Sequence, residues 1–549
     1  MRKPKLTTAI LLGLISAPAL IAVSYFGNTL TGLSFLPFDL FDWLTRVLPG
    51  SLVTFGIDSL VATLGAMGLS VSETAKLAEQ LMAISIVIAF GPLLGLLVGL
   101  SMRRFEEAPI QAGMLAGLPF FMLFLAVEFT LGLSGGFLFT AVWLFLLTAG
   151  WGAVLAYALE WLARQTPSVA AEEEGQAAPQ YDAGRRQALL KLTGAAAGIT
   201  LGAWGLGRLT QSEVTAVVQD SGAGQPLPTS VPATPGATQP AAAQNVEIPP
   251  TPSGRIAVPS GTRPEVTSNE DFYRIDINTR PPVIDGAEWQ LEVDGLFQNA
   301  RNLTIDDLMS YPSLTQPITL SCISNRVAGD LIGASYWTGV RLRDVLEDLQ
   351  LAPEAGALVL EAEDGFYETV IAEDMFDERT LLVYGMNGET LPVEHGFPLR
   401  IYIPNRYGMK QPKWIVRMEA VEAWVPGYWV ERGWSREARP QIVSVIDTIA
   451  TDAAEDGRVP LGGIAWAGDR GIQSVEVQVD DGPWQEAELR TPPISSLTWV
   501  QWRFDWPSEQ GRHTFTVRAT DGTGTLQTTE LNDPHPDGAT GYHSRSETI

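Results

Sequence analysis

The chain has 549 residues and a formal net charge of −26 at neutral pH, and 46% of its residues are apolar. Its length predicts more than two domains. Residues 1–210 hold 12 Lys and Arg against 13 Asp and Glu, which leaves 24 basic and 49 acidic residues beyond residue 210. A soluble part this acidic repels phosphate backbones, which argues against nucleic acid as a partner.

The amino-terminal part is predicted to be a membrane domain over residues 1–210. It contains five apolar runs that approach the roughly 20 residues needed to cross a bilayer as a helix. Basic residues cluster at the N-terminus, at 103–104 and between 164 and 191, and their excess in cytoplasmic loops sets the orientation. This predicts a multi-pass plasma-membrane protein, with lipid as a partner, whose chain after residue 210 is extracytoplasmic. The predicted spans are 6–27, 81–101, 112–132, 137–159 and 188–209.

Three features of this domain need separate interpretation. The run 51–68 is short and contains Asp58. Because a sixth span would break the charge rule, we expect a helix lying on the outer membrane surface. Glu128 lies toward the outer end of its span, where a carboxylate reaches water easily, and we expect a structural role. Arg185 and Arg186 precede a Gly- and Ala-rich run, and they fit a twin-arginine export signal as well as they fit cytoplasmic charges.

The membrane domain is predicted to be an anchor or docking platform without a redox centre. The four histidines of the chain all lie beyond residue 210, and the chain has no Cys-x-x-Cys-His motif. Paired imidazoles therefore cannot hold a haem in this domain. Residues 211–264 are rich in Pro, Thr, Ala and Gly without periodicity, which predicts a flexible linker.

The soluble part divides into two predicted domains. Residues 265–438 mix alternating strands with short helices, one of them capped by Thr304, which indicates an α+β domain. Residues 439–549 read as strands throughout, as in GIQSVEVQVDDG, where valines alternate with polar residues. Several short strands of this kind predict an immunoglobulin-like sandwich. We expect packing and self-association from it, such as a homodimer, and no chemistry.

The stretch ITLSCISNR contains Cys322, the only cysteine of the chain. A single cysteine cannot form an internal disulfide, so it serves packing, reactivity or metal ligation. At the end of an apolar strand it is by default a small buried hydrophobe. The surrounding motifs decide between these roles.

The order of motifs around Cys322 resembles the molybdenum-cofactor domain of the sulfite oxidase family, in its membrane-anchored bacterial form. The resemblance begins at NEDFYRIDINTRPP and runs through ITLSCISNR and GDLIGASYWTGVRLRDVL to EHGFPLRIYIPNRYGMKQPKW and the β-rich tail, so it covers about residues 265–549. It implies a domain that binds molybdenum and molybdopterin, with Cys322 as the thiolate ligand of the metal. A soft thiolate suits a redox-active transition metal.

The resemblance also assigns residues to the cofactor. Basic residues lie where the family binds the pterin and its phosphate, and a dianionic phosphate requires cations. Other residues match the segment that borders the cofactor or follow the metal ligand in its loop, where Arg326 is either part of the site or a surface charge. The implied cofactor-binding residues are Asn269, Tyr273, Asn325, His395, Arg400, Lys410 and Lys413.

Two departures from the family pattern concern the substrate. Sulfite-oxidising members have an Arg-x-His motif after the first aromatic pair, whereas here Arg274 is followed by Asp276 or Ile277 in place of the histidine. A tyrosine near the metal in those members corresponds to Trp434, whose indole donates a hydrogen bond but has no phenolic proton. We expect Cys322, Arg274 and Trp434 to be catalytic. The two changes put sulfite in question as the substrate, and leave the cofactor unaffected.

The predicted function is two-electron oxo transfer by a membrane-anchored molybdenum oxidoreductase, outside the cytoplasm, on a small or sulfur-containing substrate. Reduction of an S-oxide such as methionine sulfoxide is an alternative on the same fold, and a non-catalytic membrane-tethered scaffold is an alternative from another class. A transporter would need polar residues along the spans, which hold few apart from Glu128. Electrons need a separate carrier, a haem or quinone-linked protein, because the chain has no iron–sulfur cysteine set.

Overall fold

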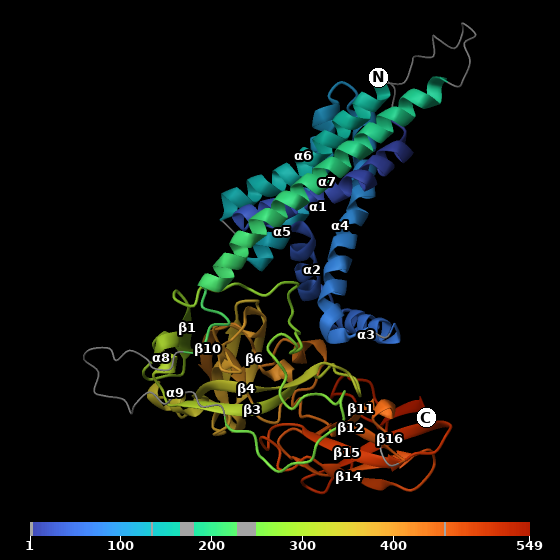
Figure 1. Ribbon diagram of the computed structural model, residues 1–549. Helices are drawn as coiled ribbons and strands as arrows, with labels where there is room; N and C mark the ends of the chain where they lie inside the picture. Colours follow the sequence, from blue (N-terminus) through green and yellow to red (C-terminus); the bar gives the residue numbers. More distant parts are fainter. Residues whose placement is uncertain (1–3, 68, 133–135, 165–179, 228–248, 455–456) are drawn as a thin grey trace. The chain divides into compact units, whose positions relative to one another are not determined.

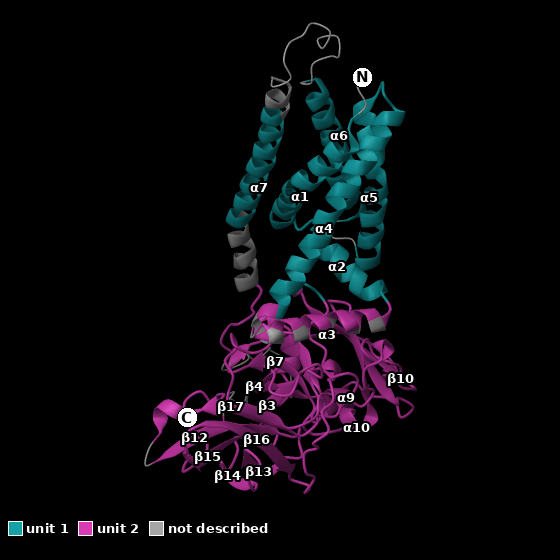
Figure 2. Cartoon of the chain, turned by 90° about the vertical axis from the view of Figure 1, so that its right-hand side faces the viewer, with its two compact units in different colours: residues 1–48, 75–217, 278–280 teal, residues 49–74, 218–277, 281–549 magenta. Residues whose placement is uncertain are grey.

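The computed structural model describes residues 4–67, 69–132, 136–164, 180–227, 249–454 and 457–549 (Figure 1). The chain forms two compact units, each discontinuous in sequence, which Figure 2 shows in different colours. Unit 1 consists of Met1–Leu48, Ala75–Val217 and Asn278–Arg280. Unit 2 consists of Pro49–Thr74, Val218–Ile277 and Pro281–Ile549.

Unit 1 is a helical bundle that packs through small residues. A Cβ atom on Gly113 of α5 would approach Gly152 O of α6 to 2.2 Å, and one on Gly117 would approach Thr148 O to 2.5 Å. Such close approach at glycine is typical of helix pairs in membranes. The helices are α1 (Leu6–Thr31), α2 (Leu36–Val47), α4 (Val71–Arg104), α5 (Pro109–Leu131), α6 (Phe137–Arg164) and α7 (Gln180–Asp220).

Five helical stretches among the described residues are long and apolar enough to cross a membrane, which confirms the five predicted apolar runs. The run 51–68 is not among them; it forms α3 (Gly50–Ala66), which belongs to unit 2. Arg185 and Arg186 lie inside the continuous helix α7. The five stretches are Leu6–Thr31, Thr74–Arg104, Pro109–Leu131, Phe137–Arg164 and Arg186–Leu209.

Unit 1 also contains a buried polar cluster. Glu128 is only 3% exposed and lies against Asp39 of α2, so it does not reach water as its position along the span led us to expect. The reason is that α2, from a different part of the sequence, covers it. Beside Asp39, Asp42 accepts a hydrogen bond from Thr279 N at 3.0 Å, so the segment containing Thr279 is part of this unit.

The α+β part of unit 2 contains two five-stranded sheets. In one, the order is β2 (Leu303–Thr304), β1 (Gln290–Gly295), β10 (Ile415–Val421), β5 (Ala357–Ala362) and β6 (Tyr367–Ile371). In the other, the order is β3 (Ser313–Ser321), β4 (Ile332–Arg341), β7 (Leu381–Met386) and β8 (Glu389–Thr390), with β9 (Arg400–Tyr402) on β7. Short helices α8 (Ile305–Met309), α9 (Leu342–Asp348) and α10 (Ala372–Met375) connect the strands, and Thr304 caps α8 as predicted.

The carboxyl-terminal part of unit 2 is all β, as predicted, and its strands pair in one sheet that nearly closes. Ile446 N of the first strand donates to His543 Nδ1 of the last at 3.0 Å. The alternating valines Val475 and Val477 are fully buried. The immunoglobulin-like arrangement stays a prediction. The order is β11 (Val443–Ile449), β12 (Arg458–Trp466), β15 (Val500–Pro507), β14 (Gln485–Leu489), β13 (Ile472–Val479), β16 (Arg512–Asp521) and β17 (His543–Thr548).

Two stretches of the predicted linker make defined contacts within unit 2. Residues 221–227 lie on unit 2, where Leu227 enters the hydrophobic core. Residues 249–264 also belong to unit 2, and the buried side chain of Arg255 pairs with Glu265. Composition correctly indicated the lack of periodic structure here, but it cannot show that an irregular segment finds partners on another surface. The stretch between the two lies outside the described residues.

Candidate active site

Cys322 lies at the start of the loop that connects β3 to β4. Cys322 N donates to Leu331 O at 2.9 Å, and Asn325 Oδ1 accepts a hydrogen bond from Leu331 N at 3.1 Å. Gly329 is required for this closure, because a Cβ atom there would lie 2.3 Å from Asn325 Oδ1. Asn325 therefore holds the loop that presents Cys322; its contact with a cofactor stays a prediction.

The Cys322 side chain is buried, and its Sγ lies 3.0 Å from Ser324 Oγ. Burial raises the pKa of this thiol, because an apolar environment disfavours the thiolate. The hydrogen bond with Ser324 and the charge of Lys413 act in the opposite direction. Metal binding by this cysteine would release its proton, because the ligand is the thiolate.

Two buried tyrosines lie close to this thiol. Burial is the main cause that raises the pKa of Tyr273 well above its usual value and that of Tyr407 to about 12. The charge of the Cys322 thiolate adds to both shifts, so both phenols lie within electrostatic range of the sulfur. The sequence predicts Tyr273 here but not Tyr407. The feature near Tyr407 that could have drawn attention to it is the turn after β9, where Asn405 adopts a φ of 55°.

Several cations lie in the same region. The pKa of His395 is lowered to about 3, first by burial and then by the charges of Lys413, Arg400 and Arg274. His395 Nε2 lies 3.0 Å from Asn269 O, so this nitrogen carries the proton of a neutral ring. The structure thus brings together these five predicted residues.

The surroundings of Arg400 suit an anionic ligand. The guanidinium is 5% exposed, donates to His395 O at 3.1 Å and lies 4.7 Å from the ring centre of Trp337. Burial lowers its pKa to about 10, and within the described residues no carboxylate pairs with it. The indole Nε1 of Trp337 is also buried without a hydrogen-bond partner among these residues. A buried cation without a carboxylate partner and a buried N–H group without an acceptor, both among the described residues, fit the phosphate and pterin of molybdopterin.

Asp276 neutralises two of the cations. Its carboxylate is 1% exposed and lies 2.7 Å from Arg274 Nε and 3.3 Å from Lys413 Nζ. We expect Asp276→Asn to lower the free energy of unfolding by roughly 3 kcal/mol, because losing one partner of a buried ion pair leaves the other uncompensated. Urea unfolding of the purified chain in detergent measures this. Asp348→Asn, at an exposed pair, is the control and should cost less than about 1 kcal/mol; equal losses would contradict the burial argument.

The depressed pKa of His395 predicts an acid-sensitive fold. The unfolded state takes up a proton below its usual pKa of 6.5, whereas the folded state does not until about 3. Stability present above pH 6.5 is therefore lost as the pH falls, at about 1.4 kcal/mol per pH unit for this group. We expect His395→Gln to reduce the slope of unfolding free energy against pH in cofactor-free protein. An unchanged slope would show that the imidazole takes up its proton at the same pH in the folded and unfolded states, so that its pKa is not lowered by folding.

Trp434 lies next to residues from the carboxyl-terminal part of the chain. Its side chain is 5% exposed, and its Nε1 is buried without a partner among the described residues. Its ring centre is 5.0 Å from that of His535. Arg326, in the Cys322 loop, pairs with Asp533 at 3.2 Å. The sequence assigns no chemistry to this region, and only the fold shows that His535 and Asp533 are neighbours of Trp434 and Arg326.

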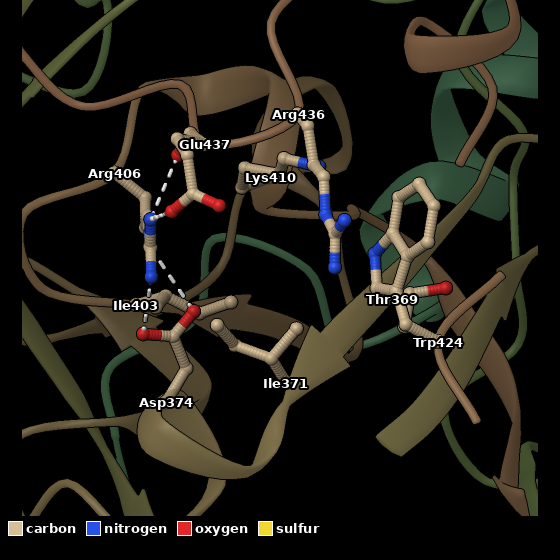
Figure 3. A pocket seen from close by; sticks show the side chains of 9 residues that line it. All are labelled: Thr369, Ile371, Asp374, Ile403, Arg406, Lys410, Trp424, Arg436 and Glu437. Carbon is tan, nitrogen blue, oxygen red and sulfur yellow. Dashed lines mark hydrogen bonds and ion pairs between the residues drawn. The ribbon is translucent and has the colours of Figure 1, made fainter. Parts of the chain in front are cut away.

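Lys410, another predicted cofactor-binding residue, has a carboxylate partner of its own. Its Nζ pairs with Glu368 at 3.0 Å, and both side chains are buried. It lines the pocket in Figure 3, where Arg406 contacts both carboxylate oxygens of Asp374 at 3.1 Å. Carboxylates neutralise both of these cations. An anionic ligand would therefore bind less favourably in this pocket than beside Arg400, which no carboxylate among the described residues neutralises. The cofactor contact of Lys410 stays a prediction.

Comparison with known proteins agrees with the class of protein that this site defines, an oxidoreductase that binds molybdopterin. The family model "Oxidoreductase molybdopterin binding domain" matches residues 278–429. The oxidoreductase YuiH of Bacillus subtilis, described as uncharacterized, is 32% identical over 156 residues, which cover 28% of this chain and 77% of YuiH. The chain belongs to the sulfite oxidase family of molybdenum-dependent oxidoreductases, and molybdenum with molybdopterin is its cofactor.

Two further relatives have names that indicate different reactions. The sulfite oxidase of Arabidopsis thaliana is 29% identical over 281 residues, covering 42% of this chain and 71% of the relative. YedZ1 of Azospira oryzae, named as a candidate protein-methionine-sulfoxide reductase subunit, is 28% identical over 152 residues, covering 28% of this chain and 56% of the relative. Both oxygen addition to sulfur and oxygen removal from it are thus represented among the similar proteins.

Proposed function

We propose that this protein is a membrane-anchored enzyme that transfers one oxygen atom to or from a small or sulfur-containing substrate outside the cytoplasm. The observation that supports this proposal concerns Arg400, a buried cation without a carboxylate partner among the described residues. It lies in the same region as the buried Cys322 thiol. A bound molybdenum cofactor supplies the two-electron exchange. Oxidation of the substrate adds one oxygen from water and releases two protons and two electrons, and reduction of an S-oxide is the reverse.

In this proposal each group of the chain has one task. Cys322 ligates the metal, and the loop bond of Asn325 fixes its position. Arg400 and Lys413 bind the anionic cofactor, and His395, whose Nε2 donates to Asn269 O, can accept a hydrogen bond at Nδ1 as a neutral ring. Arg274 shares the carboxylate of Asp276 with Lys413, and it therefore influences the charge of Lys413 through this carboxylate.

Trp434 favours an S-oxide as the second candidate substrate. Its buried Nε1 lacks an acceptor among the described residues and can donate to the oxygen of a neutral S-oxide. The printed name of YedZ1 points to the same chemistry. Sulfite instead would need cations that are free to meet its charge, and Arg274 is paired with Asp276 at 2.7 Å.

Contacts within unit 1 support the proposed orientation. Arg103 Nη2 at the end of α4 donates to Pro4 O before α1 at 2.8 Å, so these two basic segments lie at the same end of the bundle. Arg280, beyond residue 210, donates to Asn28 near the other end of α1 at 2.7 Å. Cytoplasmic basic segments would put the chain after residue 210 outside.

Steady-state kinetics of the molybdenum-loaded protein test the proposal. Sulfite is supplied with an artificial electron acceptor, and methionine sulfoxide with an artificial donor. Turnover of either supports the enzyme, and a higher kcat/KM for methionine sulfoxide supports the second candidate. Purified protein without molybdenum or pterin would favour the non-catalytic scaffold.

We also propose a separate haem or quinone-linked electron carrier and a homodimer through residues 439–549. Native mass measurement tests the homodimer.

A further inference from the structure

The helix α3 belongs to unit 2, although in the sequence it lies between α2 and α4, which belong mainly to unit 1. Unit 2 includes Pro49–Thr74, whereas the chain up to Leu48 and from Ala75 onward belongs to unit 1. The segment follows α2, which is not a candidate span, and at its carboxyl-terminal end it continues without an intervening linker into α4, which contains the candidate span Thr74–Arg104.

This segment contacts both loops that form the candidate active site. Ser70 Oγ donates to Asp330 Oδ2 at 2.7 Å, and Asp330 is the last residue before Leu331, which closes the Cys322 loop. At its other end, a Cβ atom on Gly50 would lie 2.7 Å from Cα of Arg432, two residues before Trp434.

Next to Ser70, Val71 packs against the hydrophobic cluster that contains Cys322 and Tyr273. The segment therefore contacts the metal-ligand loop with a side-chain hydrogen bond and an apolar side chain. Its opposite end contacts the turn that carries Trp434.

The exposed side chains that the structure describes on α3 are apolar or carry only a hydroxyl group. Val53 and Leu64, eleven positions apart, are buried, which defines the inward face. On the other face Leu52 is 55% exposed, Phe55 70% and Met67 66%. Ser59 and Thr63 lie between them and are exposed as well. A helix that faces water normally carries charged residues on its outer side, and none of the exposed side chains that the structure describes on this face is charged.

We propose, resting on the proposed function, that Pro49–Thr74 is the segment of unit 2 that contacts lipid. From the membrane surface, this segment holds the Cys322 loop in its position, as a brace. Lipid is the occupant of the apolar face because the carboxyl-terminal end of the segment continues directly into α4, whose stretch Thr74–Arg104 could span the bilayer. An uncharged apolar face held at that level lies in the bilayer interface. Contact with the membrane thus orders the site through Ser70 and Val71.

Photo-crosslinking of the full chain in phospholipid nanodiscs tests the lipid contact. Benzoyl-phenylalanine replaces Phe55, and the matched control carries it at Phe376, an exposed residue of unit 2 at 54%. Phospholipid adducts at position 55, in several-fold excess over position 376, are expected. Equal adducts at both positions, or crosslinks from position 55 to a second copy or another protein, would overturn the assignment.

Ser70→Ala tests the brace. Loss of one hydrogen bond of about 1.4 kcal/mol predicts roughly tenfold faster amide hydrogen exchange in residues 322–331 of the molybdenum-loaded protein. Thr63→Ala, on the exposed face, is the control and should leave this exchange unchanged. Unchanged exchange in Ser70→Ala overturns the brace. Neither exchange nor crosslinking requires turnover, so both remain decisive if the protein proves to have no oxo-transfer activity.

Discussion

Cys322→Ser is expected to retain pterin and to lose more than about 100-fold in turnover, since even groups that only support a metal ligand cost 10–100-fold when removed. The serine hydroxyl is a hard ligand with a high pKa, and it cannot replace a soft thiolate on a redox-active metal. The pterin is retained because Arg400, His395 and Lys413 are unchanged. Metal analysis, fluorescence of the oxidised pterin and steady-state kinetics measure the three quantities.

The fold should survive this change. Serine is close to cysteine in volume, and Ser324 Oγ, 3.0 Å from the sulfur, can hydrogen-bond the new hydroxyl. Ser324→Ala is the matched control, because it removes that neighbour and keeps the sulfur. We expect it to lower turnover by less than about tenfold, the equivalent of one neutral hydrogen bond. Full activity in Cys322→Ser would disprove the assigned ligand, and an equal loss in both variants would point to a general disturbance of the loop.

The sequence was most informative where residues within a few positions of one another determine the local structure. The capping box at Thr304, the valine alternation in β13 and the five apolar runs all depend on neighbours within a few positions, and the structure contains each of them. Cys322 was singled out by the ordered set of motifs around it, which resembles the sulfite oxidase family, and its role as the metal ligand stays a prediction. Its surroundings in space, however, come from distant parts of the chain.

The site residues that the sequence missed are those brought in by long-range packing. His535 reaches Trp434 from about a hundred positions away, and no local pattern predicts that contact. Lys410 shows the converse, since a position in a matching motif does not reveal that Glu368 neutralises it. The polar segments of the expected linker bind unit 2 for the same reason. Composition describes a segment, and its partners depend on the whole fold.

Arg400→Met is expected to have opposite effects on the cofactor-free and the loaded protein. In the cofactor-free protein the buried guanidinium has no carboxylate partner among the described residues. Replacing it with an apolar side chain of similar length removes a desolvation cost, so stability should stay equal or rise by about 1–3 kcal/mol. In the loaded protein the variant loses a charge-assisted contact worth about 1.5–3 kcal/mol, so pterin should be retained roughly 10–100-fold less tightly.

Arg406→Met is the matched control, because that guanidinium is equally buried but paired with Asp374 and Glu437 at 3.1 Å. Its loss leaves a buried carboxylate without a partner and should cost about 3 kcal/mol, with or without cofactor. Urea unfolding of both variants and pterin content after dialysis measure the difference. If Arg400→Met destabilised the cofactor-free protein as much as Arg406→Met, Arg400 would have a structural partner of its own. The cationic site would then not be built for an anionic cofactor.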